Sequence, residues 1–182
     1  MPNEDKMIIS RKNKHQINCK LRQLIGQSVS MLRKQNYFGL IVPNFIHIKF
    51  DNDTSIFVSN FMRITQKNKM LLSSCDEEFS TYYKEVPIKT DEEVLNDNNL
   101  LNLHIKEVSK LLKDKCVINA KLSSFGDLSI TFEGNIKICA FIDTRLNGEY
   151  LRIITGSDHF VFFFEDGTSQ CIKENCNDYC TE

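Results

Sequence analysis

Two stretches of this chain place apolar residues at helical spacing and then switch to an alternation of apolar and polar residues. In residues 18–32 the apolar side chains recur every three or four positions, and residues 45–63 then alternate. The same order returns, with a helical stripe in residues 101–112 and alternation within residues 127–164. Because the two periods belong to helix and strand respectively, each switch marks a change of secondary structure. The sequence predicts an α+β protein of two similar units, each a helix followed by an antiparallel meander.

Turn-forming residues divide each meander into strands. Asp51-Asn52-Asp53 and Gln66-Lys67-Asn68 interrupt the first, while Glu133-Gly134-Asn135, Asn147-Gly148 and Ser157-Asp158 interrupt the second. Asn-Gly is a strong signal for a two-residue hairpin turn, so we expect the strands on either side of it to pair. The expected strands are residues 45–50, 55–63, 70–74, 127–132, 136–142, 150–155 and 160–164, with a last short strand ending at 172.

The two units also match residue by residue. At an offset of 80, Leu21 aligns with Leu101 and Ile25 with Ile105, whereas the first alternating strand aligns best at an offset of 82. We interpret this as an internal duplication, since each unit alone is too small to bury its sheet. The alternative is that two amphipathic segments match through shared periodicity alone. The predicted organisation is a basic N-terminal arm at 1–17, a first unit at 18–89 and a second at 90–182.

The seven cysteines are expected to be reduced thiols. Their number is odd, and residues 1–10 carry no apolar block of the kind that directs secretion. No apolar run approaches the roughly 20 residues of a membrane span, so the expected location is the cytoplasm with no membrane association. Cys171, Cys176 and Cys180 could hold zinc together with His159, but spacings of five and four residues are not those of a zinc knuckle. We therefore predict no metal and no cofactor.

The chain lacks the sequence motifs that accompany common catalytic sites, including phosphate-binding loops, nucleophile elbows and metalloprotease helices. A nucleophilic pair of Cys139 and His159 stays open as an alternative to a structural thiol. The acidic runs 76–78 and 91–93 are interpreted as solvated carboxylates, the second at a helix start. The sequence thus predicts a protein that is not an enzyme.

Charge is concentrated at the N-terminus. Residues 1–50 carry nine Lys and Arg against two acids, although the net charge of the whole chain is −1. Such a cluster is typical of contact with phosphates or an acidic protein surface. The alternative is a solubilising tail, and the arm has no interleaved aromatic residues for base stacking. The predicted partner-binding residues are Lys6, Arg11, Lys12, Lys14, Lys20 and Arg22.

The composition, with 17 Asn and 17 Lys against two Ala, indicates a genome rich in A and T. With this composition, its pair of helix-plus-meander units and its lack of catalytic motifs, the chain resembles the anti-CRISPR inhibitors carried by phages and mobile elements of low-GC bacteria. This resemblance implies a non-catalytic protein that binds a guide-loaded Cas9-type nuclease in the bacterial host, with non-specific nucleic-acid contact through the arm. Residues 45–63 and 127–164 also resemble the sheets of toxin-immunity proteins, which implies toxin neutralisation as the alternative. Neither resemblance fixes the oligomeric state.

Overall fold

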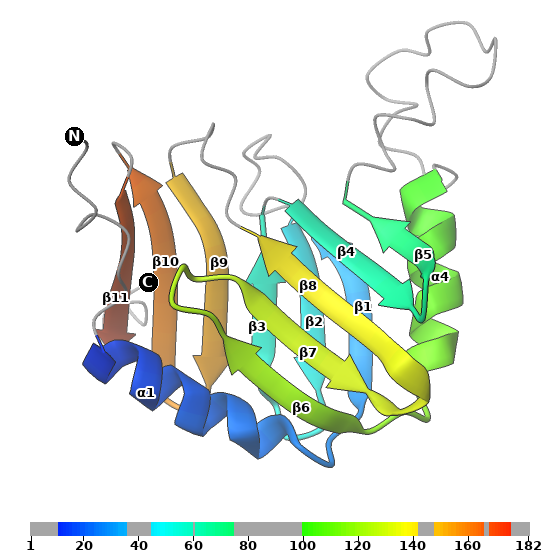
Figure 1. Ribbon diagram of the computed structural model, residues 1–182, viewed down its shortest axis with the longest axis horizontal. Helices are drawn as coiled ribbons and strands as arrows, with labels where there is room; N and C mark the ends of the chain where they lie inside the picture. The colour runs from blue at the N-terminus through cyan, green and yellow to red at the C-terminus, as the bar shows by residue number, and fades with distance from the viewer. Residues whose placement is uncertain are drawn as a thin grey trace, which may run out of the picture.

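Two antiparallel sheets packed face to face form the body of the protein, with one helix along each side (Figure 1). The computed structural model describes residues 11–35, 45–59, 61–74, 100–141, 148–165 and 168–175. It confirms a mixed α+β protein whose sheets are antiparallel. No helix in these ranges is long and apolar enough to cross a membrane.

The six-stranded sheet has the strand order β1-β2-β3-β9-β10-β11. Its strands are β1 (Val29–Gln35), β2 (Phe45–Phe50), β3 (Ser55–Val58), β9 (Gly148–Thr155), β10 (Asp158–Glu165) and β11 (Thr168–Asn175). The five-stranded sheet has the order β5-β4-β8-β7-β6. Its strands are β4 (Phe61–Gln66), β5 (Lys69–Ser73), β6 (Val117–Leu122), β7 (Leu128–Phe132) and β8 (Ile136–Phe141).

Alternation along the strands creates the core between the sheets. Ile48 and Phe50 of β2 are fully buried, as are Ile130 and Phe132 of β7 in the other sheet, because every second residue of a strand faces the same side. These residues and their neighbours on both sheets belong to one hydrophobic cluster. Each sheet therefore covers the apolar face of the other.

Helix α1 (Arg11–Leu21) continues into a single 3-10 turn, η1 (Arg22–Leu24), and runs beside β6, while α4 (Leu100–Leu112) packs on β1 and β5 (Figure 1). The Asn18 amide accepts from the Leu122 backbone N–H at 2.8 Å and donates to its carbonyl at 3.4 Å. On the other side, the Ser109 hydroxyl lies 2.7 Å from the Ile105 carbonyl of its own helix and 3.4 Å from the Leu32 carbonyl of β1. Each helix therefore places a polar side chain against the backbone of a strand at the edge of a sheet.

The helix expected over residues 18–32 is wrong beyond residue 24. Gly26 adopts φ 84°, which a glycine accepts more readily than other residues, and Val29 begins β1. A β-bulge at Ser30 explains the misleading pattern. The extra residue shifts the strand alternation, so Val29 and Leu32, three positions apart, both face the core as they would on a helix.

Some of the other expected helices, strands and turns are confirmed and others are wrong. The helix at 101–112, the strands at 45–50 and 127–132 and the turn at Gln66-Lys67-Asn68 are confirmed. The strand expected at 55–63 is wrong, because the chain leaves one sheet after Val58 and enters the other at Phe61. The Asn147-Gly148 hairpin is also wrong, since β8 and β9 belong to different sheets. Strand β6 was not expected.

The two halves of the chain follow the same path through the sheets. A helix is followed by three strands of one sheet (β1-β2-β3, or β6-β7-β8), and the chain then crosses to the other sheet (β4-β5, or β9-β10). Both first strands carry a bulge, at Ser30 and Ile118, which are 118 − 30 = 88 residues apart rather than 80. The fourth strand of each half pairs antiparallel with the third strand of the other half: β4 pairs with β8, and β9 pairs with β3.

The two units expected at 18–89 and 90–182 are consequently interleaved, since each contributes strands to both sheets. Their boundary at 89/90 and the first ten residues of the arm lie outside the described ranges. Arm residues 11–17 form the first turns of α1.

Candidate partner-binding surface

An open groove of about 480 Å³ lies between α1 and β6. Its lining includes Lys14, His15 and Arg22 from the helical segment and Lys121 from β6, with no acidic residue. The helix itself, RKNKHQINCKL, contains no Asp or Glu. The groove therefore collects positive charge, which suits an anionic ligand.

Two of the predicted partner-binding residues, Lys14 and Arg22, line this groove. The Lys14 ammonium donates to the Ser124 hydroxyl at 2.7 Å, which holds the side chain across the groove toward the loop after β6. Arg22 is exposed. Arg11 and Lys12 lie in the first turn of α1, and Lys6 is outside the described ranges.

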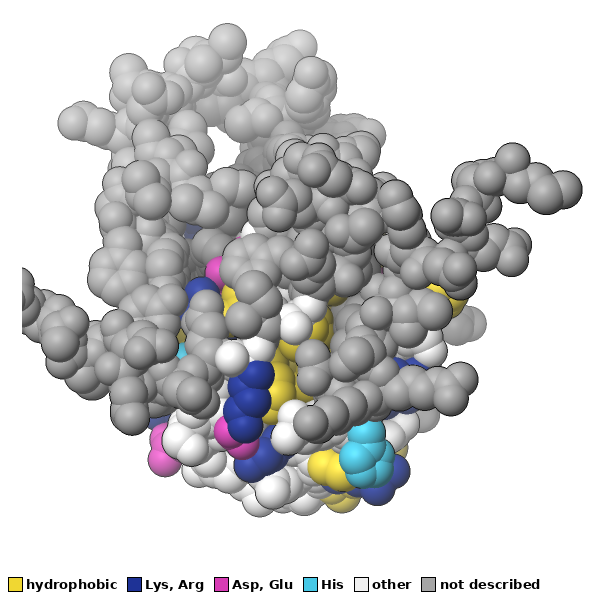
Figure 2. Space-filling model, turned by 90° about the vertical axis from the view of Figure 1, so that its left-hand side faces the viewer, with side chains coloured by type: hydrophobic (Ala, Val, Ile, Leu, Met, Phe, Trp, Pro, Cys, Tyr) yellow, Lys and Arg dark blue, Asp and Glu magenta, His cyan; other side chains and the backbone are white. Residues whose placement is uncertain are grey.

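Lys20 has a different role. Its ammonium lies 2.9 Å from the carboxylate of Asp158, which Lys173 approaches at 2.5 Å. Dark-blue and magenta side chains lie against each other on the side of the molecule seen in Figure 2. Hydrogen bonds from Lys173 and then Lys20 lower the pKa of Asp158 below its ordinary value. These ion pairs connect α1 to β10 and β11, so Lys20 anchors the helix.

The outer face of the five-stranded sheet extends this basic region. No described helix or strand lies over it (Figure 1). Its side chains point away from the core and alternate with buried residues of the same strands. None of those described is acidic. By register, they are Asn119, Lys121, Ser129, Thr131, Lys137, Cys139, Phe141, Phe61, Arg63, Thr65, Met70 and Ser73, of which Ser73 is buried. We call this set the outer sheet face.

An aromatic pair and a cation meet at one end of the outer sheet face. Phe61 and Phe141 are cross-strand partners with ring centroids 6.2 Å apart and planes tilted by 55°. The guanidinium carbon of Arg63 lies 4.8 Å from the centre of the Phe141 ring. Phe61 is 38% exposed, so part of its ring is accessible to a ligand. Cation–π contact keeps Arg63 in place on an accessible surface.

The sequence reasoning missed this surface. Alternation in residues 61–66 and 136–141 marks Arg63 and Lys137 as solvent-facing. However, only the sheet order β5-β4-β8-β7-β6 brings strands from distant parts of the chain together. The aromatic residues absent from the basic arm are supplied here by β4 and β8.

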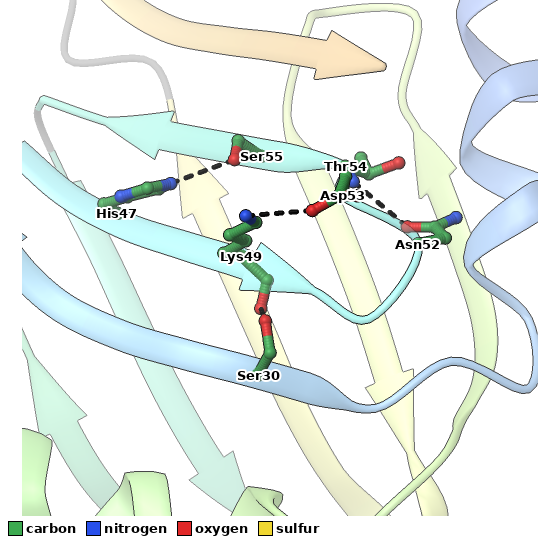
Figure 3. A network of polar contacts seen from close by, with 7 residues as sticks. All are labelled: Ser30, His47, Lys49, Asn52, Asp53, Thr54 and Ser55. Carbon is green, nitrogen blue, oxygen red and sulfur yellow. Dashed lines mark hydrogen bonds and ion pairs between the residues drawn. The ribbon is translucent and has the colours of Figure 1, made fainter. Parts of the chain in front are cut away.

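A second cluster of polar side chains lies around β2 and β3 (Figure 3). The His47 Nε2 and the Ser55 hydroxyl are 3.0 Å apart, and the His47 ring stacks on Phe57 with centroids 4.2 Å apart. Burial, then the charges of Arg33 and Lys49, lowers the His47 pKa to about 4, so the ring is neutral at pH 7. Among the described residues, nothing bonds to Nδ1 to orient the ring as a catalytic triad requires. The described contacts of the His47 ring are the Ser55 hydroxyl and the face of Phe57.

The sequence also offered cysteine, histidine and acidic residues as possible catalytic or metal-binding sites. Cys139 and His159 lie on β8 and β10, in different sheets, so the pairing across one sheet is wrong. Burial raises the pKa of the Cys171 thiol to about 12, which disfavours the thiolate that binds zinc. Cys176, Cys180 and the acidic runs 76–78 and 91–93 lie outside the described ranges. Within those ranges, no three His, Cys, Asp or Glu side chains are grouped as a metal site.

Comparison of the chain with protein-family models, with curated proteins and with solved structures finds no match.

Proposed function

We propose that this protein acts by stoichiometric binding to a partner that carries phosphate groups, and that it inhibits that partner without catalysis. The observation that supports the proposal is the continuity of positive charge from the α1–β6 groove to the outer sheet face. Lys121 belongs to both surfaces, and no described side chain on either is acidic. A partner rich in phosphate complements such a surface better than a neutral one does.

The resemblance to anti-CRISPR inhibitors makes a guide-loaded Cas9-type nuclease the partner we propose first. A ribonucleoprotein of this kind presents RNA phosphates and basic channels side by side. The dipolar charge of this chain, basic in residues 1–50 and acidic in residues 51–100, could complement both. The proposed site of action is the cytoplasm of a bacterial host.

The experiment is a titration of DNA cleavage by a panel of Cas9-type nucleases, with the protein added before and after guide loading. We expect cleavage to stop near an equimolar ratio and the protein to be recovered unchanged. The variant K14Q/R22Q removes two cations of the groove and should weaken inhibition, most strongly at low salt. The matched control K106Q/K110Q removes two exposed cations of α4 and should inhibit normally.

If no nuclease is inhibited at large excess, the anti-CRISPR proposal is wrong. Neutralisation of a toxin encoded by a neighbouring gene would then assign the alternative function of an immunity protein.

We also propose that the chain arose by duplication of a helix-plus-strands unit. The shared order of elements supports this, as do the bulges at Ser30 and Ile118. The backbone N–H of Asp51 donates to the Ser28 carbonyl, and that of Glu133 donates to the Cys116 carbonyl, at 3.1 and 3.0 Å. These two bonds occupy matching positions in the two halves.

A further inference from the structure

We infer that the outer sheet face binds single-stranded nucleic acid directly, with the bases stacked on the aromatic pair and the phosphates held by the cations. This goes beyond the proposed inhibition, because it concerns the free protein and requires no nuclease.

The cations and polar groups form a row at right angles to the strands. The register places Lys121 opposite Ser129, Ser129 opposite Cys139 and Cys139 opposite Arg63. Neighbouring strands are about 4.8 Å apart, so the row extends for roughly 14 Å from β6 to β4. A parallel row places Asn119, Thr131, Lys137 and Thr65 in register. A polynucleotide crossing the sheet therefore meets cations and hydrogen-bond donors along its whole path.

The two ends of this path differ in chemistry. At β6 the path opens into the groove, whose described lining includes the cations Lys14 and Arg22 but no Phe, Tyr or Trp. At β4 and β8 it reaches Phe61 and Phe141, with the Arg63 guanidinium over the Phe141 ring. Aromatic rings and guanidinium planes on an open sheet are the surfaces on which unpaired bases stack, about two or three bases to a sheet.

This combination favours a single strand over a duplex or an acidic protein. A duplex keeps its bases stacked inside, so the exposed Phe61 ring would gain nothing from it. An acidic protein would use the cations but has no need of a flat aromatic surface beside them. The absence of any described acidic side chain on the face removes the repulsion that phosphates would otherwise meet.

The test measures fluorescence anisotropy of labelled oligouridylate and oligothymidylate of about 12 nucleotides, within the range that small single-strand-binding modules cover. The full chain is titrated between about 50 and 200 mM salt, with a hairpin duplex in parallel. We expect both single strands to bind more tightly than the duplex. Equal or tighter binding of the duplex, or no binding of any probe, would overturn the inference.

Matched variants locate the site. R63Q/K137Q should weaken single-strand binding roughly tenfold and reduce the salt slope by about 1.4, or about 0.7 for each lost phosphate contact. K106Q/K110Q, with the same change in charge on α4, should bind within about twofold of the wild type. Equal losses in both variants would mean that net charge alone attracts the strand, against our inference.

Phe141→Leu and Phe61→Leu separate stacking from charge. Each keeps an apolar side chain but removes the ring, and binding should fall at least about fivefold, the lower limit for loss of one base–aromatic stack. Unchanged affinity in both variants would overturn the stacking assignment.

The Cys139 thiol, at the centre of the face, provides a readout without mutation. Bound oligonucleotide should slow its alkylation relative to Cys116, which precedes β6 and lies off the face. Equal alkylation rates with and without oligonucleotide would contradict the inference.

The two tests are independent. Oligonucleotide binding without nuclease inhibition would leave this inference standing and reject the Cas9 proposal, while inhibition without oligonucleotide binding would do the reverse.

Discussion

The hydroxyl oxygen of Ser28 lies 3.8 Å from the sulfur of Cys116, although the two residues are 88 positions apart. The two residues occupy the same place in the two halves. The Ser28 carbonyl accepts a hydrogen bond from the backbone N–H of Asp51, which follows β2, and the Cys116 carbonyl accepts one from Glu133, which follows β7. The two halves of the chain therefore touch each other through matching residues.

This contact predicts that Ser28→Cys will form a disulfide with Cys116 under mild oxidation. The cross-link would close a loop of nearly 90 residues and raise the free energy of unfolding by up to about 4 kcal/mol. Thermal unfolding with and without reductant measures the gain, and peptide mapping identifies the bond. The double variant S28C/C116S is the control and should show no dependence on reductant. An oxidised protein in which both thiols stay free would contradict the predicted approach of the two side chains.

Asn18→Ala should destabilise the fold by about 1–2 kcal/mol, because the Leu122 backbone N–H and carbonyl each lose a partner. Chemical denaturation measures the change. Asn119→Ala, an exposed site on the same strand, is the matched control and should shift stability by less than about 0.5 kcal/mol. Equal effects in the two variants would show that α1 does not depend on this contact.

Stability should fall as the pH decreases from about 6.5 to 4. His47 has its pKa lowered to about 4 in the folded chain, against 6.5 when unfolded, so only the unfolded chain binds a proton in this window. The contribution is fully present above pH 6.5, and its loss at pH 4 amounts to at most about 3 kcal/mol. Denaturation curves at several pH values should show this slope. His47→Phe keeps an aromatic ring for Phe57 and should flatten it, whereas an unchanged slope would assign the pH dependence to other groups.

Chains comprising residues 1–89 and 90–182 should fold together when they are co-expressed, because each half supplies a helix and strands that the other lacks. The half 90–182 expressed alone should form a homodimer if the duplication proposal is right, since a second copy can take the place of the first half. Sedimentation analysis distinguishes these species. A half-chain that is folded and monomeric would refute the interleaving.

Local pattern was sufficient to predict the α+β class, the helix of Leu101 to Leu112 and strands such as Ile46 to Phe50. It failed where tertiary structure changes the local period. The bulge at Ser30 gave Val29 and Leu32 helical spacing, and the step between Val58 and Phe61 left the alternation intact while the chain changed sheets. Alternation reports which residues face a core, but it is blind to which sheet a strand joins.

The same distinction explains the candidate surface. Lys14 and Arg22 were found because they lie in a dense run of basic residues. Lys137 and Phe141 lie on β8, more than 70 residues from Arg63 on β4, and only strand order brings Arg63 beside them. A surface assembled from a few residues of each of five strands leaves no signal within any short window of the chain.

Because Asn18 bonds to a strand 104 residues further on, α1 must wait for most of the chain to be synthesised before it can dock. At about 5–20 residues per second, the delay is on the order of 5 to 20 s, far longer than a helix or hairpin needs to form. During that interval Ile17 and Leu21, the apolar residues that α1 buries in the finished fold, face the ribosome exit and its surroundings. The nascent protein thus depends on remaining soluble while unfinished, and the basic residues of α1 are well placed to provide that solubility.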